Sequence, residues 1–203
     1  MLSDYIQRKY IDDKTLASLR SRLMHQRPFP HLLLSDFFQE PFIRQIAKAL
    51  AQQEFVYQES DLFSFSQTKD LSLLNDPDLT ALYRLLNSWE FKEYVRIITD
   101  IEVLGAIDCS GFVYRMKDYL LPHDDHLETR RVAYTLHLSK PDFSRRDGGA
   151  LELFDNGKVV VSYPPHFNTL ILFPVQEEKT LHQVSEVMTD RERFSLAGWF
   201  HDH

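Results

Sequence analysis

The sequence has only one cysteine, Cys109, only six glycines, and no apolar run long enough to cross a membrane. A single cysteine excludes an internal disulfide and any zinc site built from several cysteines. No G-x-S-x-G motif occurs, so the nucleophile turn of a serine hydrolase has no counterpart. The first residues, MLSDYIQRKYIDD, contain no apolar core of signal-peptide length. We therefore expect a protein without a membrane segment that resides in the cytoplasm.

A basic surplus is also lacking, because 23 Lys and Arg face 30 Asp and Glu and the net charge is −7. Domains that bind nucleic acid through its phosphates usually carry excess positive charge, so we expect no direct nucleic-acid binding. The acidic balance is compatible with a basic protein partner. With 43% apolar and 13% aromatic residues in 203, the chain can bury a substantial core. We expect one domain, residues 1–203.

Hydrophobic periodicity divides the chain into two parts. In residues 1–105 spacings of 3 and 4 predict helices, as for Leu16, Leu19 and Leu23. In residues 106–203 the period is 2, and turn sequences such as Asp155-Asn156-Gly157 separate short runs rich in Val, Tyr and Phe. The first part is predicted to hold helices through 16–23, 42–50, 78–86 and 91–99 and a strand within 31–38. We expect an α+β fold in which a mainly β core, a sandwich or barrel, is supported by N-terminal helices.

One group of residues suggests a metal site. His123 and Asp125 are two residues apart, and in an extended backbone such side chains point to the same face. His182 lies much further along, in KTLHQVSEV. Two imidazoles and one carboxylate form the facial triad of non-haem Fe(II) oxygenases. A short His-x-Asp pattern also occurs by chance, so a polar surface loop is the alternative interpretation.

A second signal follows His182. Arg193 lies in RFSLAGWF, whose alternation is typical of a buried strand. A buried arginine needs an anionic partner because desolvating its charge is costly. That partner is either an internal Asp or Glu, or a ligand carboxylate held by the guanidinium fork. Ser195 faces the same way and adds a hydroxyl group. Together with the predicted metal site, this pattern is much more specific than either part alone.

These motifs resemble the 2-oxoglutarate- and Fe(II)-dependent oxygenases of the prolyl-hydroxylase group, above all the catalytic domain of the ribosomal prolyl hydroxylases. The similar stretches are 61–71, 120–138, 147–154 and the segments around His182 and Arg193. The resemblance implies a double-stranded β-helix (a jelly roll, or cupin-like fold) flanked by N-terminal helices. It implies hydroxylation of a prolyl residue of a protein, with a small-subunit ribosomal protein as the expected target and with succinate and CO2 as products. The implied cofactor is Fe(II), the co-substrates are 2-oxoglutarate and O2, and ascorbate is the expected supporting reductant.

The resemblance also implies roles for single residues. The iron ligands are His123, Asp125 and His182, and the co-substrate pocket is formed by Arg193, Ser195, Tyr114, His137 and Trp199. Among these, Arg193 matches the residue that binds the distal carboxylate of 2-oxoglutarate. His137 departs from the pattern, because relatives usually carry a tyrosine there that bonds the same carboxylate. An imidazole can donate one such bond. The eukaryotic relatives also carry a second β-helix domain, for which the sequence up to His203 has no counterpart.

Two other functions are consistent with parts of the pattern. One is a 2-oxoglutarate oxygenase that acts on a small molecule or on another protein residue. The other is a non-catalytic β-helix module that binds a partner, which the intact metal and arginine pattern disfavours. The segment 61–71 is expected at the substrate entrance, with a surface loop or an edge strand as the alternative. His126, Arg130 and Arg131 are expected on the solvated surface, and His201 in a terminal tail.

Overall fold

The predicted helices of the first part are present in the computed structural model, which describes residues 1–140 and 142–203. Their starts follow from capping: the Asp12, Asp76 and Ser88 side chains accept hydrogen bonds from the first backbone N–H groups of three helices. The α helices are α1 (Asp13–His25), α2 (Glu40–Leu50), α3 (Pro77–Leu86) and α4 (Trp89–Thr99), and the short 3-10 turns are η1 (Leu2–Asp4), η2 (Arg8–Tyr10), η3 (Leu71–Leu73) and η4 (Arg145–Asp147).

The strands form a single sheet of eleven strands, in which every pairing between strands is antiparallel. They are β1 (Leu32–Ser35), β2 (Val56–Ser60), β3 (Phe63–Gln67), β4 (Ser110–Tyr114), β5 (Tyr119–His123), β6 (Arg130–His137), β7 (Leu151–Asp155), β8 (Lys158–Tyr163), β9 (Thr169–Pro174), β10 (His182–Val184) and β11 (Arg193–His201). The order is β1-β9-β6-β11-β4-β3-β5-β10-β7-β8, and β2 pairs with β3.

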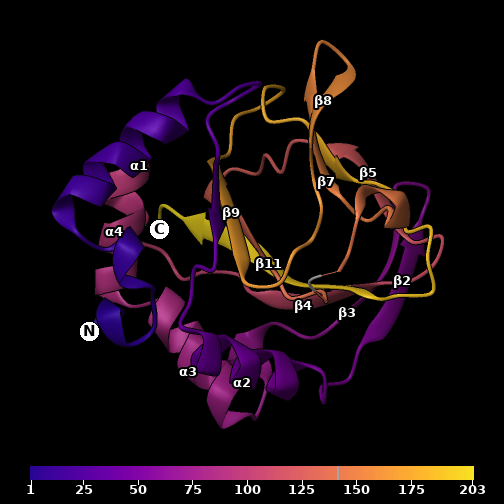
Figure 1. The fold of residues 1–203 in the computed structure, drawn as a ribbon, viewed down its shortest axis with the longest axis horizontal. Helices are drawn as coiled ribbons and strands as arrows, with labels where there is room; N and C mark the ends of the chain where they lie inside the picture. Colours follow the sequence, from indigo (N-terminus) through magenta and orange to yellow (C-terminus); the bar gives the residue numbers. More distant parts are fainter. Residues whose placement is uncertain (141) are drawn as a thin grey trace.

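The sheet curls so that its two ends face each other (Figure 1). Leu151 and Leu153 of β7 pack against Ile171 and Phe173 of β9, although the two strands lie far apart in the pairing order. β3 connects the two halves because it pairs with β4 at one end and with β5 at the other. The helices cover only the outside of the half that contains β9 and β11 (Figure 1).

In the half of the sheet that contains β9 and β11, successive side chains of the central strands point to opposite faces. Apolar residues on the two faces form two separate cores. Val132 and Leu136 of β6 belong to the large core shared with the helices, whereas Ala133 belongs to the inner core between the two halves. Successive side chains of a strand point to opposite faces, so a strand covered on both sides is apolar almost throughout. Cys109 is completely buried in the helix-facing core, and burial raises the pKa of its thiol to about 12.

Several expectations need correction. The strand expected within 31–38 is present as β1, but residues 1–105 contribute two further strands, β2 and β3. Residues 63–67 form β3 inside the sheet rather than a loop or an edge strand. His201 lies in β11 rather than in a terminal tail, and its ring nitrogens contact Thr129 Oγ1 and Asp108 Oδ2. Within the described ranges, no helix is long and apolar enough to traverse a bilayer.

Candidate active site

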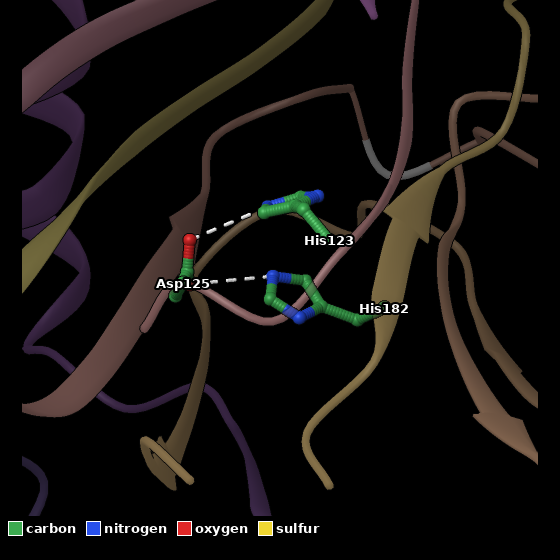
Figure 2. A group of neighbouring side chains, drawn as sticks. All are labelled: His123, Asp125 and His182. Atoms are coloured by element: carbon green, nitrogen blue, oxygen red, sulfur yellow. Dashed lines mark ion pairs between the residues drawn. The ribbon is translucent and has the colours of Figure 1, made fainter. Parts of the chain in front are cut away.

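The two histidines of the predicted metal site lie on neighbouring strands. His123 ends β5, His182 begins β10, and antiparallel pairing places the two residues opposite each other. Their Nε2 atoms each lie 3.3 Å from a different carboxylate oxygen of Asp125 (Figure 2). Potential ligand atoms of the three residues all lie within 4.8 Å of one another. This arrangement is compact enough for one ion to contact all three side chains.

Asp125 reaches the site through a turn rather than through the strand. It lies beyond the end of β5 with φ of 63°, in the left-handed region that only a few residue types, aspartate among them, adopt readily. The expectation that His123 and Asp125 share a face of an extended strand was therefore wrong in its geometry. The turn itself brings the carboxylate back toward the two imidazoles. Such backbone conformations often occur at functional sites.

Hydrogen bonds to backbone carbonyl groups orient both imidazoles. Nδ1 of His123 lies 2.9 Å from the Leu121 oxygen, and Nδ1 of His182 lies 2.7 Å from the Thr180 oxygen. Because a carbonyl oxygen can only accept, each Nδ1 carries the hydrogen. Nε2 is therefore the nitrogen that faces Asp125 in each ring, and it is the atom that coordinates once it gives up its proton to make room for a metal.

Electrostatics keep the Asp125 carboxylate ionised. Burial alone would raise its pKa, but hydrogen bonds and charge from His123 and His182 outweigh burial and hold the pKa far below the usual range. Burial alone would lower the pKa of His123, but its hydrogen bond and charge interaction with Asp125 raise it. The cluster therefore offers an anionic oxygen ligand and two nitrogen ligands.

Arg193 is a buried cation without an acidic partner. It begins β11, is only 2% exposed, and donates from Nε to the Gly149 oxygen at 2.9 Å and from Nη1 to Ser195 Oγ at 2.9 Å. Its guanidinium carbon lies 4.7 Å from the centre of the Tyr114 ring. Among the described residues, no Asp or Glu forms an ion pair with it. The internal-acid alternative is thus excluded for these residues, and a ligand anion is the remaining partner.

The other predicted pocket residues surround Arg193 on β4 and β6. Tyr114 is opposite Arg193 in the β4–β11 pairing, and burial raises the pKa of its phenol to about 12. His137 is opposite Ser195 in the β6–β11 pairing and is fully buried, and neither ring nitrogen has a hydrogen-bond partner among the residues described. Burial, and then the charge of Arg193, holds the pKa of His137 well below its usual value. His137 is therefore a neutral imidazole.

A cavity of about 400 Å³ connects the metal ligands with Arg193. The predicted residues that line it are His123, Asp125, His182, Arg193, Ser195, Tyr114 and Trp199. His137 is not among its lining residues. Seven of the eight predicted site residues therefore meet at one cavity, which has a potential metal site and an unpaired buried cation in its wall.

Residues 109–201 match the family model described as the 2OG-Fe(II) oxygenase superfamily. This chain carries a 2OG-Fe(II) oxygenase domain. The matched stretch begins just before β4 and includes the three potential metal ligands and Arg193.

Curated relatives of this oxygenase domain have names that specify proline. The chain is 37% identical over 182 residues to prolyl 3-hydroxylase OGFOD1 of Xenopus laevis, an alignment that covers 86% of this chain and 35% of the relative. It is 33% identical over 207 residues to prolyl 3,4-dihydroxylase OGFOD1 of Ostreococcus tauri, covering 92% of this chain and 40% of the relative. The chain thus spans between a third and two fifths of the length of these relatives.

Solved structures confirm the fold. A prolyl-4-hydroxylase from Pseudomonas putida superposes with a TM-score of 0.74 at 17% identity, covering 91% of this chain and 99% of that one. A prolyl hydroxylase from Trichoplax adhaerens, solved with a peptide fragment of the hypoxia inducible factor oxygen degradation domain, gives 0.73 at 14% identity, with 96% of each chain covered. The predicted α+β fold with a jelly-roll core is therefore confirmed.

The residues of the oxygenase domain fit the cofactor that its family implies. Two imidazole nitrogens and one carboxylate are the donor set of a non-haem Fe(II) site, and three ligands leave further coordination positions open. The unpaired guanidinium of Arg193, with Ser195 beside it, fits the distal carboxylate of 2-oxoglutarate. His123, Asp125 and His182 would hold the iron, and Arg193 would hold the co-substrate.

Other residues of the cavity wall were given no individual role from the sequence, although Phe63 and Phe65 lie in the segment 61–71 expected at the substrate entrance. Phe63 and Phe65 of β3 form an aromatic wall, with ring centroids 4.7 Å apart. Arg130 was expected in solvent but lies in the wall, with its guanidinium carbon 3.4 Å from the centre of a Trp199 ring. A register shift in the β6–β11 pairing, between Phe200 and His201, changes the alternation just where Arg130 pairs. Simple counting along β6 therefore does not show where Arg130 points.

Proposed function

We propose that this domain is a 2-oxoglutarate- and Fe(II)-dependent dioxygenase that hydroxylates a prolyl residue of a protein. The observation that carries the proposal is the buried, unpaired Arg193 in the wall of the same cavity as His123, Asp125 and His182. Such an arrangement suits a ligand that contacts a metal at one end and presents a carboxylate at the other. The names of the curated relatives support a prolyl substrate.

The protein's own residues bind, orient and exclude water. Arg193 and Ser195 anchor the distal carboxylate of the co-substrate, and the Tyr114 ring packs against the guanidinium. The backbone carbonyl groups of Leu121 and Thr180 fix the two imidazoles in the orientation that coordinates metal. When bound, Fe(II) and 2-oxoglutarate supply the oxidative chemistry, in which O2 and the co-substrate are converted to succinate, CO2 and one oxygen atom inserted into a substrate C–H bond.

The rest of the cavity wall suits an apolar ring carried by a peptide. Phe63, Phe65 and Leu120 form one apolar wall, and Trp199, stacked with Arg130, provides a further aromatic surface. Arg130, in the same wall, is half-buried, and its guanidinium carries N–H groups besides the buried Nε that can donate to a peptide carbonyl group. A prolyl ring flanked by peptide groups matches this mixture of apolar surface and a hydrogen-bond donor.

A small-subunit ribosomal protein is the proposed target, and the cytoplasm the proposed location. The net charge of −7 supports a basic partner of this kind. We also expect ascorbate to support turnover by keeping the iron reduced.

The co-substrate site is tested by anaerobic titration of the Fe(II)-loaded protein with 2-oxoglutarate, followed by air and a succinate assay. We expect the visible absorption band of a chelated 2-oxo acid, then succinate. Arg193→Gln should weaken 2-oxoglutarate binding by roughly 10- to 100-fold, because charged hydrogen bonds contribute about 1.5–3 kcal/mol. Arg131→Gln is the matched control, since Arg131 pairs with Asp202 instead. Unchanged affinity in the Arg193 variant would refute the assignment.

The substrate class is tested by presenting proline-containing ribosomal peptides and their alanine-substituted versions. A gain of one oxygen atom that requires the proline, detected by mass spectrometry, supports the proposal. Oxidation of the alanine peptide at another residue, or of small molecules only, would instead indicate an oxygenase of another substrate class. Absence of a band and of succinate from folded, iron-loaded protein would indicate a non-catalytic module.

A further inference from the structure

The two segments that carry the metal ligands are separate in the sequence, and the sheet joins them through the short strand β10, which pairs with β5 and β7. His182 lies at the start of β10, which has three residues, and the pairing of β10 with β5 shifts register between His182 and Val184. The residues before β10 form a loop in which Glu178 has a left-handed backbone, with φ of 57°. The strand pairing places His182 opposite His123, but it includes neither the turn that bears Asp125 nor the loop before His182.

Asp124 bridges these two segments from the position between two of the ligands. One carboxylate oxygen accepts a hydrogen bond of 3.0 Å from the backbone N–H of His126, within its own turn. The other oxygen accepts a hydrogen bond of 2.8 Å from the backbone N–H of Glu178, in the opposite loop. The Asp124 side chain, which is not part of the ligand cluster, thus holds the loop that leads to His182.

Thr180 completes the connection. It is fully buried, and its hydroxyl oxygen lies 3.0 Å from the backbone oxygens of both Asp124 and Gln176, so its single proton is shared between these two acceptors. The backbone oxygen of Thr180 accepts the Nδ1–H of His182 at 2.7 Å. A continuous hydrogen-bonded path therefore runs from the Asp125 turn to the imidazole of His182.

We propose that Asp124 and Thr180 are positioning residues of the metal centre, which hold the His182 loop against the turn that carries His123 and Asp125. The inference rests on the proposed function, because it requires a metal at these ligands. Neither residue offers a ligand atom to the cluster. Both act through the placement of His182, whose coordination depends on the distance between the two segments.

The test measures Co(II) affinity of the apo protein by calorimetry, without co-substrate. Asp124→Ala removes both carboxylate contacts and should weaken Co(II) binding by roughly 10- to 100-fold, the usual effect of losing an outer-shell partner. Thr180→Val keeps the shape of the side chain and removes the hydroxyl, both its donated hydrogen bond and its acceptance from the Gln176 N–H, so it should weaken binding as well. Asp124→Asn retains one acceptor oxygen and should be intermediate. Glu128→Gln, at an exposed position in the same loop, is the matched control and should bind as the wild type.

The double variant Asp124→Ala, Thr180→Val should weaken Co(II) binding by less than the product of the two single effects. The reason is that both substitutions break the same connection between the Asp125 turn and the His182 loop. Thermal unfolding is measured in parallel. A variant that melts earlier but binds Co(II) as tightly as the wild type shows a merely structural role and overturns the proposal. Asp124→Asn and Thr180→Val keep the test valid if Asp124→Ala does not fold. Failure of the wild type itself to bind Co(II) would overturn the proposed function as well, whereas equal binding by all variants would overturn only the positioning role.

Discussion

Arg130 and Trp199 form a stacked pair in the cavity wall, beside the turn that carries Asp125. The guanidinium carbon of Arg130 is 3.4 Å from the centre of a Trp199 ring, and Nη1 lies 3.4 Å from the backbone oxygen of Asp125. Stacking of this kind contributes about 0.5–2 kcal/mol, depending on how far the pair is desolvated. The cation therefore stabilises both the indole and the turn that carries a metal ligand.

Removal of this cation should expose the Trp199 indole to water. The chain has two tryptophans, and Trp89 is 74% exposed, so a Trp89→Phe background isolates the emission of Trp199. In that background, Arg130→Ala should shift the emission to longer wavelength and lower the free energy of unfolding by about 1 kcal/mol. Arg131→Ala, which removes the neighbouring arginine paired with Asp202, should leave the emission in place. An unshifted spectrum in the Arg130 variant would show that the stacked pair does not form.

At the scale of elements, β11 is the strand on which the site depends most, because it carries Arg193, Ser195 and Trp199 and pairs with both β4 and β6. Its close approach to the chain before β4 requires a glycine. A Cβ atom on Gly198 would lie 1.8 Å from the backbone oxygen of Asp108, which no side-chain rotation can relieve.

Gly198→Ala should therefore destabilise the domain by about 3 kcal/mol, at the upper end of the range for overpacked positions. Gly111→Ala on the adjacent strand is the comparison, since its Cβ would meet side-chain atoms rather than backbone: the end of Leu50 at 2.7 Å and the Thr68 methyl group at 3.2 Å. We expect a loss of about 1 kcal/mol there. Urea unfolding measures both. Equal losses would mean that the backbone near Asp108 moves aside freely.

The helices could be predicted because the spacing of apolar residues acts within a few residues, and the structure adds local caps such as Asp76 and Ser88 at their starts. The position of β3 could not be predicted. Its alternation of Phe and Ser indicates a strand, but its place between β4 and β5 depends on partners distant in sequence. The metal ligands were identified by residue type, whereas the left-handed turn at Asp125 left no signal in the sequence.

At the scale of the whole molecule, the interior encloses two histidines whose protonation is disfavoured by burial. His137 is fully buried with both ring nitrogens unpaired among the described residues, and His31 is buried with hydrogen bonds to the Phe29 oxygen and Tyr163. Burial lowers the pKa of both imidazoles from the usual value of about 6.5. The unfolded chain therefore binds more protons at these positions as the pH falls below that value, and stability decreases.

Replacing His137 should reduce this acid sensitivity. Between pH 6.5 and 5.5, we expect His137→Phe to lose about 1 kcal/mol less stability than the wild type, since one buried group no longer titrates. Urea unfolding at both pH values gives this difference. The pKa of His123 is raised, so its contribution to the pH dependence of stability has the opposite sign. This contribution cancels in the comparison because both proteins contain His123. Identical pH dependence of the two proteins would show that His137 is protonated without cost in the folded state.

The burial of Cys109 has a consequence for oxidative damage. The domain has one sulfhydryl, and this group lies in the helix-facing core, whereas the metal ligands line the cavity between the two halves of the sheet. A thiol with a pKa of about 12 holds almost no thiolate, which is the form that oxidants attack. The one thiol of this chain is therefore protected from oxidation by its burial in the helix-facing core, away from the cavity proposed to hold iron.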